Sequence, residues 1–106
     1  LFDPKRVNVL GEYGGIGLPV ENHLWWNKRN WGYVQFKNSD EVTAEYVKYA
    51  NILKDYVKRG FSAAVYTQTT DVEGEVNGLM TYDRKVIKID EAAVKKANQS
   101  VINELK

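Results

Sequence analysis

An amphipathic segment between two short apolar runs is the feature that most constrains the fold of this chain. Across residues 38–59, apolar side chains recur at the roughly 3.6-residue period of an α-helix. The apolar runs at residues 7–10 and 61–66 have the composition of buried strands, and the second has the profile of a strand buried on both faces. Strands that are joined by a crossover helix are parallel. The sequence therefore predicts an α/β fold.

Capping signals mark the ends of this helix and the start of another. Asn38 or Ser39 suits the N-cap position, and Glu41 follows Asn38 at the spacing of a capping box. Gly60 suits the left-handed conformation that commonly ends a helix. A final helix is predicted after Asp90, which is a suitable N-cap. Its narrower apolar stripe consists of Val94, Ala97, Val101 and Leu105.

Two long polar stretches separate these elements. Residues 13–38 are expected to be irregular, as are residues 67–88 except for a turn at 78–83 and a short extended piece at 86–89. The order is strand, loop, helix, strand, loop, helix. A parallel sheet needs cover on both faces, which two helices cannot supply. We therefore expect residues 1–106 to be part of a larger domain, completed by further barrel elements or by association between copies.

Composition excludes several classes of function. The formal net charge of the 106 residues is +1, so no electrostatic argument supports binding to nucleic acid or to an anionic membrane. No apolar run approaches the ~20 residues of a membrane span. The chain has no cysteine and one histidine, His23, so a thiolate or histidine metal site is not expected, and no cofactor is predicted.

A single carboxylate lies at a glycine-rich turn after the first predicted strand. Glu12 is flanked by Gly11, Gly14 and Gly15, which remove side-chain bulk around it. Barrel enzymes place catalytic groups at the carboxyl ends of their core strands. The alternative is that Glu12 is a solvated loop residue or a helix cap, which is the commoner role of such an acid.

The ordered set of motifs resembles the carboxyl-terminal quarter of the catalytic (β/α)₈ barrel of glycoside hydrolase family 2. The resemblance extends over about residues 5–103. It depends on Gly-Glu-Tyr-Gly-Gly at 11–15, Gly-Leu-Pro-Val at 17–20, His-Leu-Trp at 23–25, Asn-Trp-Gly-Tyr at 30–33, Ala-Ala-Val-Tyr-Thr-Gln-Thr-Thr-Asp-Val-Glu at 63–73 and Val-Asn-Gly-Leu at 76–79. The resemblance implies a fragment of a TIM barrel that contains its last two strand–helix units.

This resemblance implies that Glu12 is the nucleophile of a retaining β-glycoside hydrolase. Such an enzyme needs a second carboxyl group as acid/base, about 5–5.5 Å from the nucleophile. In the family that group belongs to an Asn-Glu pair on the fourth strand, and the one such pair here, Asn103-Glu104, is in the predicted last helix. We therefore expect an active parent protein and an inactive fragment. The alternative is a non-catalytic fragment that binds carbohydrate or assembles with itself.

The resemblance also bears on specificity and location. Tyr66 ends the predicted eighth strand, where relatives commonly carry an aromatic residue that forms a wall of the sugar pocket. Galactosidase-type members have a substrate-contacting histidine where this chain has Gly15, so we expect that the parent is not an efficient β-galactosidase. Export of bacterial members of this family suggests a periplasmic or secreted protein.

Other residues are weaker candidates for the site. Trp25, Trp26 and Trp31 could stack on sugar rings or pack the first loop onto the barrel, and Trp25 is the best candidate for a sugar contact. Gln68 and Asp71 could reach the mouth of the pocket. His23 is expected to order its loop by hydrogen bonding. The acids Asp71, Glu73 and Glu75 could hold Ca²⁺, but a solvated or helix-capping role is favoured because they lack EF-hand spacing.

Overall fold

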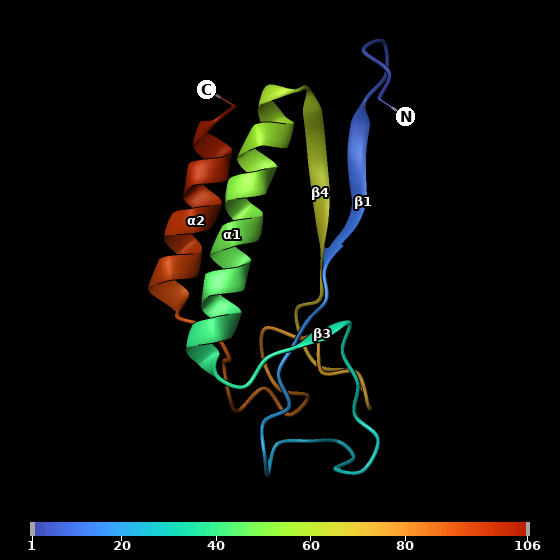
Figure 1. The fold of residues 1–106 in the computed structure, drawn as a ribbon, viewed down its shortest axis with the longest axis vertical. Helices are drawn as coiled ribbons and strands as arrows, with labels where there is room; N and C mark the ends of the chain where they lie inside the picture. The colour runs from blue at the N-terminus through green and yellow to red at the C-terminus, as the bar shows by residue number, and fades with distance from the viewer. Residues whose placement is uncertain (1, 106) are drawn as a thin grey trace.

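The computed structural model describes residues 2–105 and has a mixed α/β fold (Figure 1). The α/β prediction is therefore confirmed. In chain order the elements are β1 (Asn8–Gly14), β2 (Ile16–Gly17), β3 (Val34–Gln35), α1 (Ser39–Lys58), β4 (Phe61–Thr67) and α2 (Glu91–Asn103).

The two longer strands form a parallel pair, as the crossover helix predicts. The register runs from Asn8 opposite Phe61 to Gly14 opposite Thr67, with irregularities on either side of the Val9–Leu10 pairing. The prediction that Glu12 follows the strand was wrong, because β1 continues through it to Gly14. The strand is longer than its apolar run because pairing with β4 continues across the glycines.

Helix α1 has the predicted caps. The Asn38 side chain accepts a hydrogen bond from the Glu41 backbone N–H at 2.9 Å, so Asn38 and not Ser39 is the N-cap. The Glu41 carboxylate accepts from the Lys37 N–H at 3.3 Å, one residue before the position that a capping box requires. At the other end Gly60 has φ +104°, the left-handed conformation that favours glycine. These contacts stabilise both ends of the helix without help from distant residues.

Helix α2 begins as predicted but buries less of its stripe. The Asp90 side chain accepts from the Ala93 N–H at 3.2 Å and caps the helix. Val94 and Ala97 are buried against the rest of the molecule. Leu105, however, lies beyond the last helical residue and is 66% exposed. The prediction that it belongs to the buried stripe was wrong because the helix ends at Asn103.

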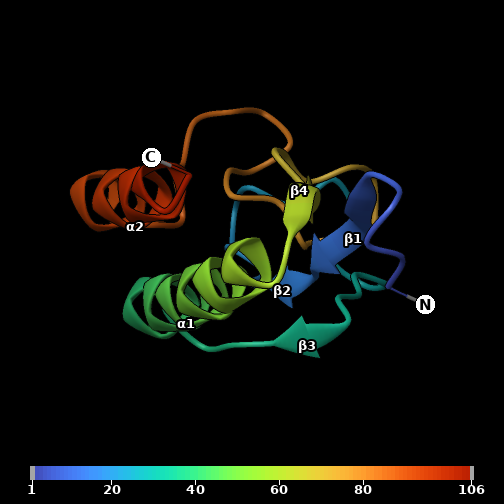
Figure 2. The same cartoon turned by 90° about the horizontal axis from the view of Figure 1, so that it is seen from above.

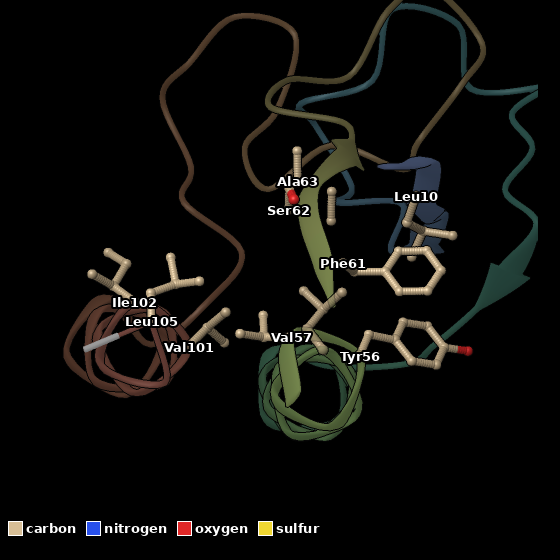
Figure 3. Close-up of a pocket in the computed structure, with 11 residues that line it drawn as sticks. Leu10, Tyr56, Val57, Phe61, Ser62, Ala63, Val101, Ile102 and Leu105 are labelled. Atoms are coloured by element: carbon tan, nitrogen blue, oxygen red, sulfur yellow. The ribbon is translucent and has the colours of Figure 1, made fainter. Parts of the chain in front are cut away.

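Both helices lie on one side of the strand pair, as Figure 2 shows from above. Helix α1 packs against α2 and against β4. The core forms where α1 meets the segment that follows β1 and the start of α2, and its buried members are Ile16, Leu18, Val42, Tyr46 and Val94. A further apolar hollow lies between α1, α2 and the start of β4, lined by residues that include Val57, Phe61 and Ile102 (Figure 3).

The opposite face of the strand pair has no cover in the part of the chain that the structure describes. Val9 is 49% exposed and Val65 is 53% exposed. The prediction of buried strands, and of a β4 buried on both faces, was wrong for this chain because its two helices shield one side only. This outcome follows the expectation that two helices cannot cover a parallel sheet.

The loops gather at the carboxyl ends of β1 and β4 (Figure 1). Residues 13–38 are less irregular than predicted, because β2 and β3 form a second parallel pair through hydrogen bonds from Val34 N to Gly15 O and from Phe36 N to Gly17 O. The predicted turn and extended piece of the second loop are confirmed: Arg84 N bonds to Thr81 O, and Ile87 pairs with Met80. Within residues 2–105, no helix has the length and apolar character that crossing a membrane requires.

Candidate active site

Glu12 presents its carboxylate at the end of the parallel strand pair where the loops gather. The Thr67 hydroxyl, at the end of β4, donates a hydrogen bond of 3.1 Å to Glu12 Oε1. Glu12 is otherwise exposed to solvent. The two strands thus bring together a carboxylate and a hydroxyl that are 55 residues apart in the sequence.

The carboxylate lies in an open depression built by three segments. Its lining consists of Glu12, Tyr13, Gly14, Gly15, Tyr33 and Thr67. Backbone hydrogen bonds hold the segments together, from Gly15 N to Thr67 O at 2.8 Å and from Val34 N to Gly15 O at 3.1 Å. Both β4 and the first loop are therefore fixed relative to the end of β1.

The glycine pair after Glu12 is required by this close approach. Gly14 has φ +109°, and a Cβ there would lie 2.6 Å from the Thr67 carbonyl oxygen. Gly15 has φ +69°, and a Cβ there would lie 2.6 Å from Cδ2 of Tyr33. Residues with a side chain rarely adopt either backbone conformation, and a side chain would have no room at either position. The Tyr33 ring therefore occupies the space that a side chain at position 15 would need.

Tyr33, like Thr67, is a lining residue that sequence reasoning missed. Its side chain is 65% exposed, and its ring lies edge to face with Trp31, with ring centroids 5.3 Å apart. Its backbone N–H donates to Oδ1 of the buried Asn77 at 3.2 Å. Its place in the Asn-Trp-Gly-Tyr motif was visible in the sequence, but nothing local indicated that its ring would cover Gly15.

Tyr66 points toward the core and not into the depression. Its ring centroid lies 5.2 Å from that of Tyr13 and 5.1 Å from that of Tyr46 on α1. Burial raises the pKa of Tyr13 to about 12 and raises that of Tyr66 further. The Tyr66 hydroxyl has no hydrogen-bond partner among residues 2–105. The predicted sugar wall at Tyr66 is therefore not part of the Glu12 depression as the described residues form it.

The structure does not bring Trp25 to the carboxylate either. Trp25 is 62% exposed and packs edge to face on Tyr82, with ring centroids 5.5 Å apart. Trp26 lies under the Arg29 guanidinium, 5.4 Å from ring centroid to Cζ, which is a cation–π contact. These rings are exposed on the first loop, but they are absent from the lining of the depression.

The predicted role of His23 in ordering its loop is confirmed. Its Nδ1 lies 2.8 Å from Asp83 Oδ2, which joins the first loop to the second. Asp83 Oδ1 also accepts a 2.6 Å hydrogen bond from the Thr81 hydroxyl. These hydrogen bonds, that of Thr81 first and that of His23 second, hold the pKa of Asp83 well below its usual value.

Asp71 is neither solvated nor at the mouth of the depression, so both predictions for it were wrong. It is 5% exposed, and its Oδ1 accepts from Lys88 Nζ at 2.6 Å and from the Gly78 N–H at 2.9 Å. Burial raises the pKa of Asp71 and lowers that of Lys88. Sequence reasoning missed the partner because lysine is rarely buried, whereas here burying the Asp71 carboxylate requires a countercharge.

Gln68 also faces inward. Its backbone N–H donates to Asn77 O and its carbonyl accepts from Leu79 N–H, while its side-chain Nε2 is inaccessible and unpaired within the described residues. It does not line the depression. Across residues 2–105, no group of three or more histidine, cysteine, aspartate and glutamate side chains is arranged to hold a metal ion.

Comparison with known proteins adds no family assignment. The sequence matches no family model and no curated protein.

Proposed function

We propose that this chain is the nucleophile-bearing part of a retaining β-glycoside hydrolase, with Glu12 as the nucleophile. In this proposal β1 and β4 are the last two strands of a (β/α)₈ barrel, and α1 and α2 are the helices that follow them. The parent protein hydrolyses O-glycosidic bonds of a carbohydrate substrate. The sequence resemblance to glycoside hydrolase family 2 is the starting point of the proposal.

One observation carries the proposal: Glu12 lies at the carboxyl end of a parallel strand pair, in an open depression, with the Thr67 hydroxyl bonded to one carboxylate oxygen. The carboxyl ends of parallel strands are the positions at which barrel enzymes carry their catalytic groups. The Thr67 bond orients one oxygen of Glu12, and the other stays free to attack an anomeric carbon. Of the glycines beside it, Gly11 faces open space, because a Cβ there would meet no atom within 4 Å.

The chemistry requires a second carboxyl group. Of the residues that line the depression, Glu12 is the one acid. A retaining hydrolase forms a covalent glycosyl-enzyme intermediate on its nucleophile while an acid about 5–5.5 Å away protonates the leaving oxygen. In the proposal that acid belongs to another part of the parent barrel, so residues 1–106 alone do not turn over substrate.

The test is to trap the intermediate in the full-length parent protein. A 2-fluoro-glycoside with a good leaving group slows breakdown of the intermediate and should label Glu12, as read by peptide mass spectrometry. Glu12→Gln should reduce turnover by several orders of magnitude and leave the thermal unfolding unchanged. Labelling of another carboxylate, or near-normal turnover by the variant, contradicts the proposal.

A second candidate is a carbohydrate-binding fragment without catalysis. It is favoured by the exposure of four aromatic rings on one loop, those of Trp25, Trp26, Trp31 and Tyr33. Aromatic faces bind the apolar faces of sugars at little cost in conformational entropy. Sugar binding by the 106-residue chain, together with a parent that has no hydrolase activity, would favour this candidate.

A further inference from the structure

We propose that the Tyr33 ring is the platform on which the sugar next to the scissile bond lies, and that it takes the place of the side chain missing at Gly15. This inference rests on the proposed function and names a residue that determines its specificity. The ligand class is a β-linked pyranoside that presents an apolar C–H face to the ring.

The first step concerns space. A Cβ placed on Gly15 would lie 2.6–3.1 Å from the Cδ2, Cβ and Cγ atoms of Tyr33. Any side chain at position 15 would therefore overlap Tyr33, and the left-handed φ of +69° disfavours one in any case. The wall that a side chain at position 15 would form is instead an aromatic ring from a segment 18 residues later.

The second step concerns rigidity. Tyr33 is exposed, yet its ring packs edge to face on Trp31. Its backbone is held by the hydrogen bond from its N–H to Asn77 Oδ1 and by the pairing of the adjacent Val34 N–H with Gly15 O. Asn77 is fully buried, and its amide donates to Glu75 Oε1 at 3.2 Å. A fixed aromatic ring binds a ligand with little loss of conformational entropy.

The third step concerns position. Tyr33 and Glu12 line the same depression, and the intervening residues are connected by short contacts, from Glu12 to the Thr67 hydroxyl and from Thr67 O to Gly15 N. A sugar placed for attack by Glu12 therefore lies against the exposed Tyr33 face. Two aromatic residues, Tyr13 and Tyr33, line this depression. Tyr13 is half-buried with its ring packed edge to face on Tyr66, so Tyr33 is the exposed aromatic wall.

The experiment compares Tyr33 variants of the full-length protein. Binding of a non-hydrolysable S-linked β-glycoside is measured by calorimetry in the Glu12→Gln background, and KM and kcat for an aryl β-glycoside are measured in the active protein. Tyr33→Ala should weaken binding and raise KM about tenfold, whereas Tyr33→Phe, which keeps the ring face, should stay within about twofold of the parent. Tyr33→Leu keeps an apolar side chain over Gly15 and should bind as poorly as Tyr33→Ala.

A matched control is Phe2→Ala. Phe2 is also an exposed aromatic residue, 50% exposed, but it packs on Phe61 at the start of β4, the opposite end of the strand pair from Thr67. Its replacement should leave KM and binding unchanged. Thermal unfolding of every variant separates loss of the platform from loss of the fold, and Tyr33→Leu provides the test if Tyr33→Ala does not fold.

The outcomes separate this inference from the proposed function. Glu12 labelling by the 2-fluoro-glycoside together with unchanged binding by Tyr33→Ala and Tyr33→Leu rejects the platform and keeps the hydrolase. Weakened binding without labelling of Glu12 keeps the platform and rejects the hydrolase. An effect of Phe2→Ala as large as that of Tyr33→Ala also rejects the platform.

Discussion

Thr67, at the end of β4, is hydrogen-bonded to Glu12 on β1 at the proposed site. The Thr67 hydroxyl donates to Glu12 Oε1, and the same residue accepts the Gly15 N–H through its carbonyl. Thr67 thus contacts the carboxylate with its side chain and fixes the adjacent turn with its backbone. Substitution of the side chain alone tests the first of these contacts without changing the second.

We expect Thr67→Val in the full-length protein to lower kcat about tenfold. A hydrogen bond to a charged group contributes about 1.5–3 kcal/mol, and the lower end applies at this exposed carboxylate. Thr67→Ser keeps the donor and should retain most of the activity. Steady-state kinetics on a β-glycoside provide the measurement, and equal losses in the two variants would show that the hydroxyl has no part in orienting Glu12.

At the scale of elements, an ion pair holds the second loop together. Lys88 Nζ bonds to Asp71 Oδ1 and to Val76 O, and both charged side chains are at most 3% exposed. The raised pKa of Asp71 and the lowered pKa of Lys88 have burial as their first cause, so each charged form is disfavoured in spite of its partner. Replacing one partner of such a pair lowers the free energy of unfolding strongly, because the remaining charge stays buried without a countercharge.

Lys88→Met should therefore destabilise the protein by about 3–5 kcal/mol, as measured by chemical denaturation. The double variant Asp71→Asn, Lys88→Met should be more stable than Lys88→Met alone, since an amide retains an acceptor for the Gly78 N–H and carries no charge. A double variant that is no more stable than Lys88→Met would show that the uncompensated charge is not the source of the loss.

At the scale of the whole molecule, the chain is elongated and leaves apolar surface open. Its radius of gyration is 15.0 Å, whereas a compact domain of this length has about 13 Å. Val9 and Val65 are exposed on the open face of the strand pair, and the apolar hollow between α1, α2 and β4 adds a second uncovered surface (Figure 3). In the proposed barrel, the open face of the strand pair would lie against the other strands.

We expect the 106-residue chain, expressed by itself, to form dimers or larger oligomers. Unpaired strand edges and exposed apolar faces favour association between copies. Sedimentation should show the association, and Val65→Lys on the open face should weaken it. Ala44→Lys, on the exposed side of α1, is the control. A well-folded monomer at high dilution would count heavily against the barrel-segment proposal.

The sequence by itself determined the features that depend on neighbouring residues. Helix α1, an N-cap at Asn38 or Ser39 and the Gly60 terminus were predicted because helical period and capping act over a few positions. The parallel pairing of β1 and β4 followed from the helix between them. Glu12 at a glycine-rich strand end was also visible in the sequence, because the glycines are its neighbours along the chain.

The tertiary structure alone decided the contacts between distant segments. Tyr33 covers Gly15 because Asn77, 44 residues away, holds its backbone, and Asp71 is buried because Lys88 reaches it across 17 residues. The direction of Tyr66 depended on the Tyr46 ring of α1. Side-chain environments of this kind depend on how separate segments pack, and no local pattern of residue types encodes which of several polar or aromatic side chains will face the depression.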